Sequence, residues 1–132
     1  MDINVLALAY MGDAIYEVYI RKYLIKNNIV KVNELQKNSI KYVSAPNQAE
    51  ILKNLIDMNF FNSDELDIIK RARNHKCNHK PKNTDMITYK NATGIEALIG
   101  YLYFQNKKDR IDDIMFKVLE MGEIVCMYLE RM

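Results

Sequence analysis

The chain has 132 residues, of which 49% are hydrophobic, which is enough for one compact domain with a core and excludes a disordered chain. The formal net charge is only +2, so no overall electrostatic field points to nucleic acid. The two cysteines have no framework spacing, the N-terminus lacks the order of a signal peptide, and no stretch is long and uncharged enough to span a bilayer, so we expect a cytoplasmic protein with no membrane partner.

Helical apolar periodicity dominates the first half of the chain. A long first helix is expected over residues 4–25, with basic residues at its end that suit the helix dipole. A second helix, with a weaker apolar face, is expected over residues 32–42. Pro46 is well placed to begin a third helix that ends near Met58, because proline fits the first turn of a helix.

Asn62 or Ser63 can cap a fourth helix, which leads into residues 75–83. That segment has no apolar periodicity and contains Pro81, so it is predicted to be an exposed loop. Three further helices are expected after it, over residues 85–90, 94–104 and 109–129. The predicted fold is therefore all-α, a single-domain bundle of six or seven helices that spans residues 1–132.

Two segments, residues 5–20 and 92–100, are apolar on almost all sides, and each contains an acid, Asp13 in the first and Glu96 in the second. Such a helix is normally buried, and a buried ionised carboxylate is costly unless a cation or a donor compensates it. Four small residues would allow the two helices to pack closely: Gly12, Gly94, Ala97 and Gly100. We therefore predict that the two helices lie side by side and bring the two carboxylates together.

The chemistry of this acid pair favours a metal site. Two like charges in one buried site repel each other unless one is protonated or a cation lies between them. Carboxylate oxygens suit Mg²⁺, which typically takes one or two protein carboxylates, keeps positions for water and phosphate, and can activate a water against a phosphodiester. The alternative is that Asp13 and Glu96 are ordinary structural acids. Glu17, one turn after Asp13, either supports the site or pairs with Arg21.

A basic segment without acids covers residues 70–82 of this nearly neutral chain. Such a cluster is a candidate anion site, and its composition suits contacts to a nucleic-acid backbone more than the reading of bases. The side chains expected to contact phosphates are Arg71, Arg73, Lys76, Lys80, Lys82 and Asn83. The alternative is an ordinary solvated surface. His75, Cys77 and His79 are not expected to bind a metal, because they lack a fourth ligand.

Several segments, in order along almost the whole chain, resemble one family. Residues 8–21, with the Gly-Asp-Ala motif around Asp13, resemble the signature helix of the ribonuclease III catalytic domain, and residues 95–102 resemble its second acidic helix. Residues 43–52, 70–74 and 81–85 are similar to segments of the short bacterial subgroup, Mini-ribonuclease III. The motif alone would be a weak signal, but the ordered set of segments is a strong one.

The resemblance implies an all-α, Mg²⁺-dependent endoribonuclease that cleaves double-stranded RNA as a homodimer. It implies that Asp13 and Glu96 are the catalytic and metal-binding acids, that the basic segment binds RNA, and that the reaction matures the ends of the 23S ribosomal RNA precursor. A ribosomal protein that presents the RNA is a further candidate partner. Because the chain has no room for a separate double-stranded-RNA-binding domain, the affinity for RNA is expected to come from the catalytic domain itself.

Two positions depart from the pattern of the full-length enzymes of the family. Ala9 and Thr93 stand where those enzymes carry a glutamate and an aspartate. The short subgroup shows the same kind of replacements. The number of bound ions is therefore left open, with Glu17 and Asp85 as candidate contributors. The same departures are the best support for the alternative function, a non-catalytic dimeric RNA-binding or ribosome-associated module with the same fold.

Overall fold

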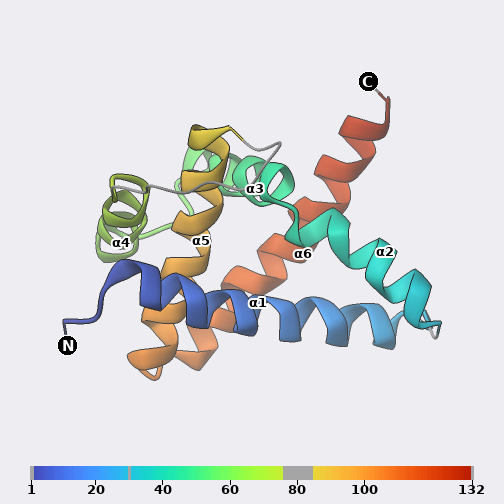
Figure 1. Cartoon of the computed structure of the whole chain (residues 1–132), viewed down its shortest axis with the longest axis horizontal. Coiled ribbons are helices and arrows are strands. Elements are labelled where there is room, and N and C mark those ends of the chain that lie inside the picture. Colours follow the sequence, from blue (N-terminus) through green and yellow to red (C-terminus); the bar gives the residue numbers. More distant parts are fainter. Residues whose placement is uncertain (1, 30, 76–84, 132) are drawn as a thin grey trace.

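The computed structural model describes the backbone of residues 2–29, 31–75 and 85–131 and the side chains of this part up to residue 123. This part of the chain contains six helices and no strand, which confirms the predicted all-α fold (Figure 1). The helices are α1 (Val5–Lys26), α2 (Val32–Val43), α3 (Ala45–Asp57), α4 (Ser63–Arg73), α5 (Met86–Phe104) and α6 (Lys108–Arg131). None of the described helices is both long and apolar enough to cross a membrane.

Helix α5 lies at the centre of the fold and packs against α1, α3, α4 and α6 (Figure 1). From Ala92 to Gly100 every residue except Glu96 is buried, because the helix is covered on all sides. The prediction of a separate short helix before residue 94 is wrong, since α5 is one continuous helix. Asp85 caps it by accepting a hydrogen bond from the Thr88 amide at 2.8 Å, and tertiary packing around Gly94 offsets the low helix propensity of glycine.

Helix α1 is buried on one face only, which corrects the expectation that the helix around Asp13 is buried all round. Leu8, Tyr16 and Ile20 point into the core. On the opposite side Tyr10 is 83% exposed and Val18 is 62% exposed, although both are large and apolar. The uniform apolarity of this sequence therefore reflects a core face and a second, uncovered apolar face.

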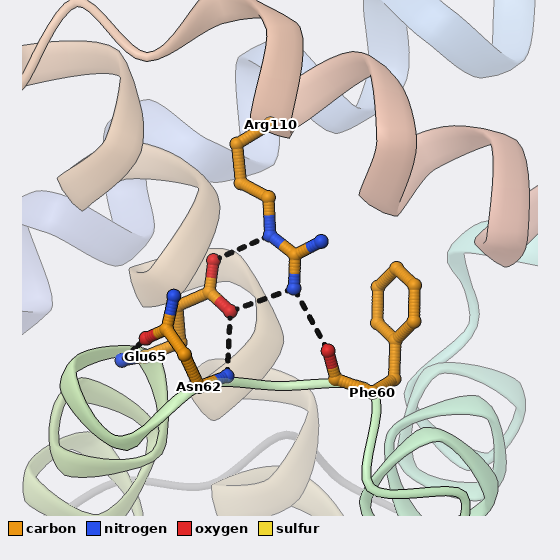
Figure 2. Close-up of polar contacts among 4 residues, drawn as sticks. All are labelled: Phe60, Asn62, Glu65 and Arg110. Atoms are coloured by element: carbon orange, nitrogen blue, oxygen red, sulfur yellow. Dashed lines mark hydrogen bonds and ion pairs between the residues drawn. The ribbon is translucent and has the colours of Figure 1, made fainter.

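Helices α4 and α6 are joined by a buried carboxylate, that of Glu65, which is 2% exposed (Figure 2). Asn62 caps α4, and its backbone N–H donates to Glu65 at 3.0 Å. Arg110 donates to the same carboxylate through Nε at 2.7 Å and Nη2 at 2.8 Å, and also to the Phe60 carbonyl at 2.8 Å. Burial alone would raise the pKa of Glu65, but these donors and the guanidinium charge lower it overall.

Candidate active site at the crossing of α1 and α5

The crossing of α1 and α5 is closed by two glycines, one on each helix. A Cβ atom on Gly12 would lie 1.7 Å from the carbonyl oxygen of Glu96, and one on Gly100 would lie 1.9 Å from the carbonyl oxygen of Leu8. Real Cβ atoms do not approach backbone so closely, so only glycine permits this spacing at either position. The predicted close packing of the two helices is confirmed for Gly12 and Gly100. Gly94 faces elsewhere, toward side chains of α3 and α4, among them Arg73.

The crossing brings Asp13 and Glu96 together, as the sequence predicted. The two carboxyl groups are hydrogen-bond partners, with Asp13 exposed at the surface and Glu96 half-buried beneath it. Burial raises the pKa of Glu96 to about 9, and the hydrogen bond with Asp13 and the negative charge of that residue act in the same direction. The Gln48 amide opposes this increase. The expectation that Asp13 itself is buried is wrong, because it projects from the solvent side of α1.

The donor set of this pair fits a hard divalent cation. Two carboxylates that share a proton in the absence of other positive charge can share a cation instead, and Mg²⁺ commonly binds one or two protein carboxylates and completes its shell with water or phosphate. Among the residues that the structure describes, no group of three or more histidine, cysteine, aspartate or glutamate side chains could hold a metal ion. In the described part of the chain the candidate site therefore rests on two carboxylates, those of Asp13 and Glu96.

The two positions at which the full-length enzymes carry further acids are closed to solvent. Ala9 and Thr93 are both buried, and the Thr93 hydroxyl donates to the Tyr89 carbonyl at 2.9 Å. The other candidate acids have partners of their own. Glu17 accepts a hydrogen bond from Arg21 at 2.9 Å, and Asp85 caps α5. The site is thus built from one carboxylate on each crossing helix.

A buried polar pair, Tyr16 and Gln48, lies next to Glu96 and was not predicted as part of the site. The Tyr16 hydroxyl donates to the Tyr42 carbonyl at 2.9 Å, and burial raises the pKa of Tyr16 well above its usual range, with the nearby Glu96 carboxylate adding to the increase. Gln48 is 2% exposed, and its amide faces both Tyr16 and Glu96. Gln48 shares the helical phase of the core residues Leu52 and Leu55, which was the available sequence signal.

The basic side chains of the predicted phosphate-binding segment are described only in part. Arg71 and Arg73 are exposed in the last turn of α4. Arg73 also lines a cavity of about 580 Å³ between α3 and α5, together with Lys53 and Asn91. The remaining predicted contacts, Lys76, Lys80, Lys82 and Asn83, lie outside the described residues.

Comparison with known proteins connects this arrangement to one family. Residues 6–107 match the family model described as the ribonuclease III domain. The chain is 43% identical over 117 residues to a Mini-ribonuclease 3 of Staphylococcus aureus, covering 89% of this chain and 87% of that protein. It is 46% identical over 112 residues to a Mini-ribonuclease 3 of Brevibacillus brevis, covering 85% of this chain and 82% of that protein. A crystal structure of a Fusobacterium nucleatum protein superposes with a TM-score of 0.79 at 35% identity, covering 90% of this chain and 93% of the other.

Proposed function

The chain belongs to the ribonuclease III domain family, and from this premise we propose that it is a Mg²⁺-dependent endoribonuclease that hydrolyses double-stranded RNA at Asp13 and Glu96. The proposed catalytic domain spans residues 1–132. The observation that carries the proposal is the contact between the two carboxyl groups at the glycine-closed crossing of α1 and α5. An acid pair that is rigidly held and open to solvent on one side suits metal-assisted chemistry on a large substrate.

Each acid has a part in the proposed reaction. Bound Mg²⁺ would supply charge stabilisation for the phosphodiester and a lowered pKa for a coordinated water. Asp13, which is exposed on α1, would hold the cation at the surface of the helix crossing. Glu96 on α5 would be the second ligand. Its raised pKa means that it holds a proton in the absence of the cation, and it would release that proton to solvent when the cation binds.

The proposed substrate is the 23S ribosomal RNA precursor, which the resemblance of the sequence to the short subgroup implies. The exposed charges of Arg71 and Arg73 at the end of α4 support a contact with the RNA backbone. Asp67 lies one turn before Arg71 on α4, whereas Arg73 has no acid three or four residues before it. We assign phosphate binding, and no base reading, to this end of the helix.

The active form is proposed to be a homodimer that uses the uncovered face of α1. Tyr10 and Val18 are exposed there. A cavity of about 410 Å³ at Val18 is lined mainly by apolar residues, Ile15, Val18, Tyr19, Tyr103 and Ile111, together with Asn106 and Lys108. A contiguous apolar surface of this kind is typical of a protein–protein contact. Asp13 lies on the same side of α1 as Tyr10, so a second copy on this face would lie close to the proposed site.

The proposal is tested by cleavage of a precursor ribosomal RNA stem with Mg²⁺, comparing the wild type with Asp13→Asn and Glu96→Gln. Both variants are expected to lose cleavage while the circular dichroism of the helices is unchanged, because each substitution removes a metal ligand and leaves the side-chain volume. Full activity in either variant would contradict the site assignment. Lys37→Gln, on the exposed surface of α2, is the matched control and should cleave as the wild type does.

A non-catalytic RNA-binding or ribosome-associated module remains the competing function. The buried Ala9 and Thr93, in place of two family acids, are the observation that favours it. The acid pair argues against it, because a scaffold gains nothing from two carboxyl groups held in contact. Binding of the RNA stem without cleavage in Mg²⁺, Mn²⁺ and Co²⁺ would support the module and overturn the enzyme.

A further inference from the structure

The Gln48 side chain is an unusual occupant of the core face of α3. It is 2% exposed, and its Nε2 atom has no hydrogen-bond partner among the described residues. A buried amide without a partner destabilises the folded state, whereas a leucine at this position would avoid that cost. The Nε2–H donor is therefore available for a hydrogen bond that the ligand-free geometry does not complete.

The Gln48 amide faces two groups that could accept a hydrogen bond from its Nε2–H, the Tyr16 hydroxyl and the Glu96 carboxyl. The Tyr16 hydroxyl donates its hydrogen bond to the Tyr42 carbonyl, so it presents only acceptor lone pairs toward Gln48, and Nε2 makes no hydrogen bond of normal geometry to it. The Glu96 carboxyl is the other neighbour, and it is engaged with Asp13 from α1. The amide therefore lies between a fixed acceptor in the core and one of the two proposed metal ligands.

We propose that Gln48 is a positioning residue for Glu96: its Nε2–H donates to one carboxylate oxygen of Glu96 when the other oxygen binds the divalent cation. This inference rests on the proposed function. A ligating carboxylate is usually oriented by a hydrogen bond to its remaining oxygen, and loss of such a partner typically weakens metal binding about 10–100-fold. In this proposal Gln48 does not bind the cation itself. It orients the Glu96 carboxylate, which does.

The test uses metal affinity and stability as readouts separate from cleavage. Gln48→Met keeps the side-chain volume and removes the donor. Mn²⁺ affinity, measured by electron paramagnetic resonance titration without RNA, is expected to fall about tenfold or more. The urea midpoint of the metal-free variant should stay equal to the wild type or increase, because the unpaired amide is gone. Gln36→Met on the exposed surface of α2 is the matched control, and both its Mn²⁺ affinity and its midpoint should be unchanged.

Two further comparisons keep the inference separate from the proposed function. Gln48→Leu repeats the measurement with a second apolar side chain should the Met variant fold poorly. Wild-type Mn²⁺ affinity in a folded Gln48 variant would overturn the positioning role alone, as would a decrease in stability with unchanged affinity. Mn²⁺ binding that survives in Asp13→Asn would overturn the metal site and, with it, the role of Gln48.

Discussion

Gly12 lies directly against the backbone of Glu96, so close that a single methyl group on Gly12 would reach to 1.7 Å from the Glu96 carbonyl oxygen. This contact links the spacing of two helices to the spacing of two carboxyl groups. Asp13 follows Gly12 directly in the sequence. The glycine that allows α1 to approach α5 is therefore the neighbour of the acid that depends on this approach to reach Glu96. Packing and proposed chemistry are therefore coupled at one point of the chain.

Gly12→Ala is expected to push α1 away from α5. Overpacking of this kind typically costs about 1–3 kcal/mol of unfolding free energy, and the displacement of Asp13 should also abolish most of the cleavage activity. Gly94→Ala is the matched control, because the nearest atoms there are side-chain atoms at 3.3–3.5 Å and alanine is a better helix former. Urea denaturation and cleavage assays check both variants. A Gly12→Ala protein as stable as Gly94→Ala would contradict the geometry.

Neutralising Arg71 and Arg73 together is expected to weaken RNA binding and reduce its dependence on salt. The slope of log K against log[salt] should fall by about one unit for each RNA phosphate that the variant no longer neutralises. The measurement is RNA binding across a salt series in Ca²⁺ or without metal, so that cleavage does not interfere. Lys37→Gln on α2, at the opposite end of the molecule from α4 in Figure 1, should leave the slope unchanged. An unchanged slope in the double variant would exclude the end of α4 from the RNA interface.

Val18→Glu is expected to convert the proposed homodimer into monomers, because it places a charge on the uncovered apolar face of α1. Light scattering after size-exclusion chromatography measures the mass directly. Val32→Glu, at a similarly exposed apolar position on α2, is the control and should keep the wild-type mass. A wild type that is already monomeric at micromolar concentration would refute the assignment of this face.

The Glu65–Arg110 pair predicts a specific decrease of stability in acid. Because the pKa of Glu65 is lower in the folded protein, its contribution is present above the ordinary carboxyl value of 4.5 and disappears as the pH falls through the folded value. Urea denaturation from neutral pH to about pH 3 should show this decrease in the wild type and a flatter profile in Glu65→Gln.

Removal of the Arg110 guanidinium from the Glu65–Arg110 pair should lower the free energy of unfolding at neutral pH. Arg110→Met leaves a buried carboxylate without its partner, which typically costs about 3–5 kcal/mol of unfolding free energy. Arg21→Met is the control, because its bridge to Glu17 is exposed and such pairs contribute about 0–1 kcal/mol. An equal loss of unfolding free energy in the two variants would show that the buried pair contributes no more to stability than the exposed one.

The local pattern of the sequence predicted most of the fold, because helix signals are short-range. Pro46, Asn62 and the apolar periodicity gave helix positions close to those observed, and the small residues predicted the crossing that brings Asp13 and Glu96 together. The division of α5 was predicted wrongly, since the side chains that pack around Gly94 come from distant segments.

The errors at the candidate site have a common physical origin. An apolar residue can face the core or an uncovered surface, and the sequence does not distinguish Tyr10 from Tyr16, so Asp13 was expected to be buried. Gln48 was passed over because a single amide on a core face becomes meaningful only once its neighbours are known. The Glu65–Arg110 pair joins residues on separate helices and has no local signature.

The contacts of Gly12 and Gly100 also determine where the chain can tolerate amino-acid substitutions. No side chain fits at Gly12 or Gly100, so a library that randomises the crossing of α1 and α5 would consist largely of misassembled proteins. Arg71, which is exposed at the end of α4, carries no such constraint. Directed evolution of RNA affinity should therefore vary exposed positions such as Arg71 and hold the crossing fixed.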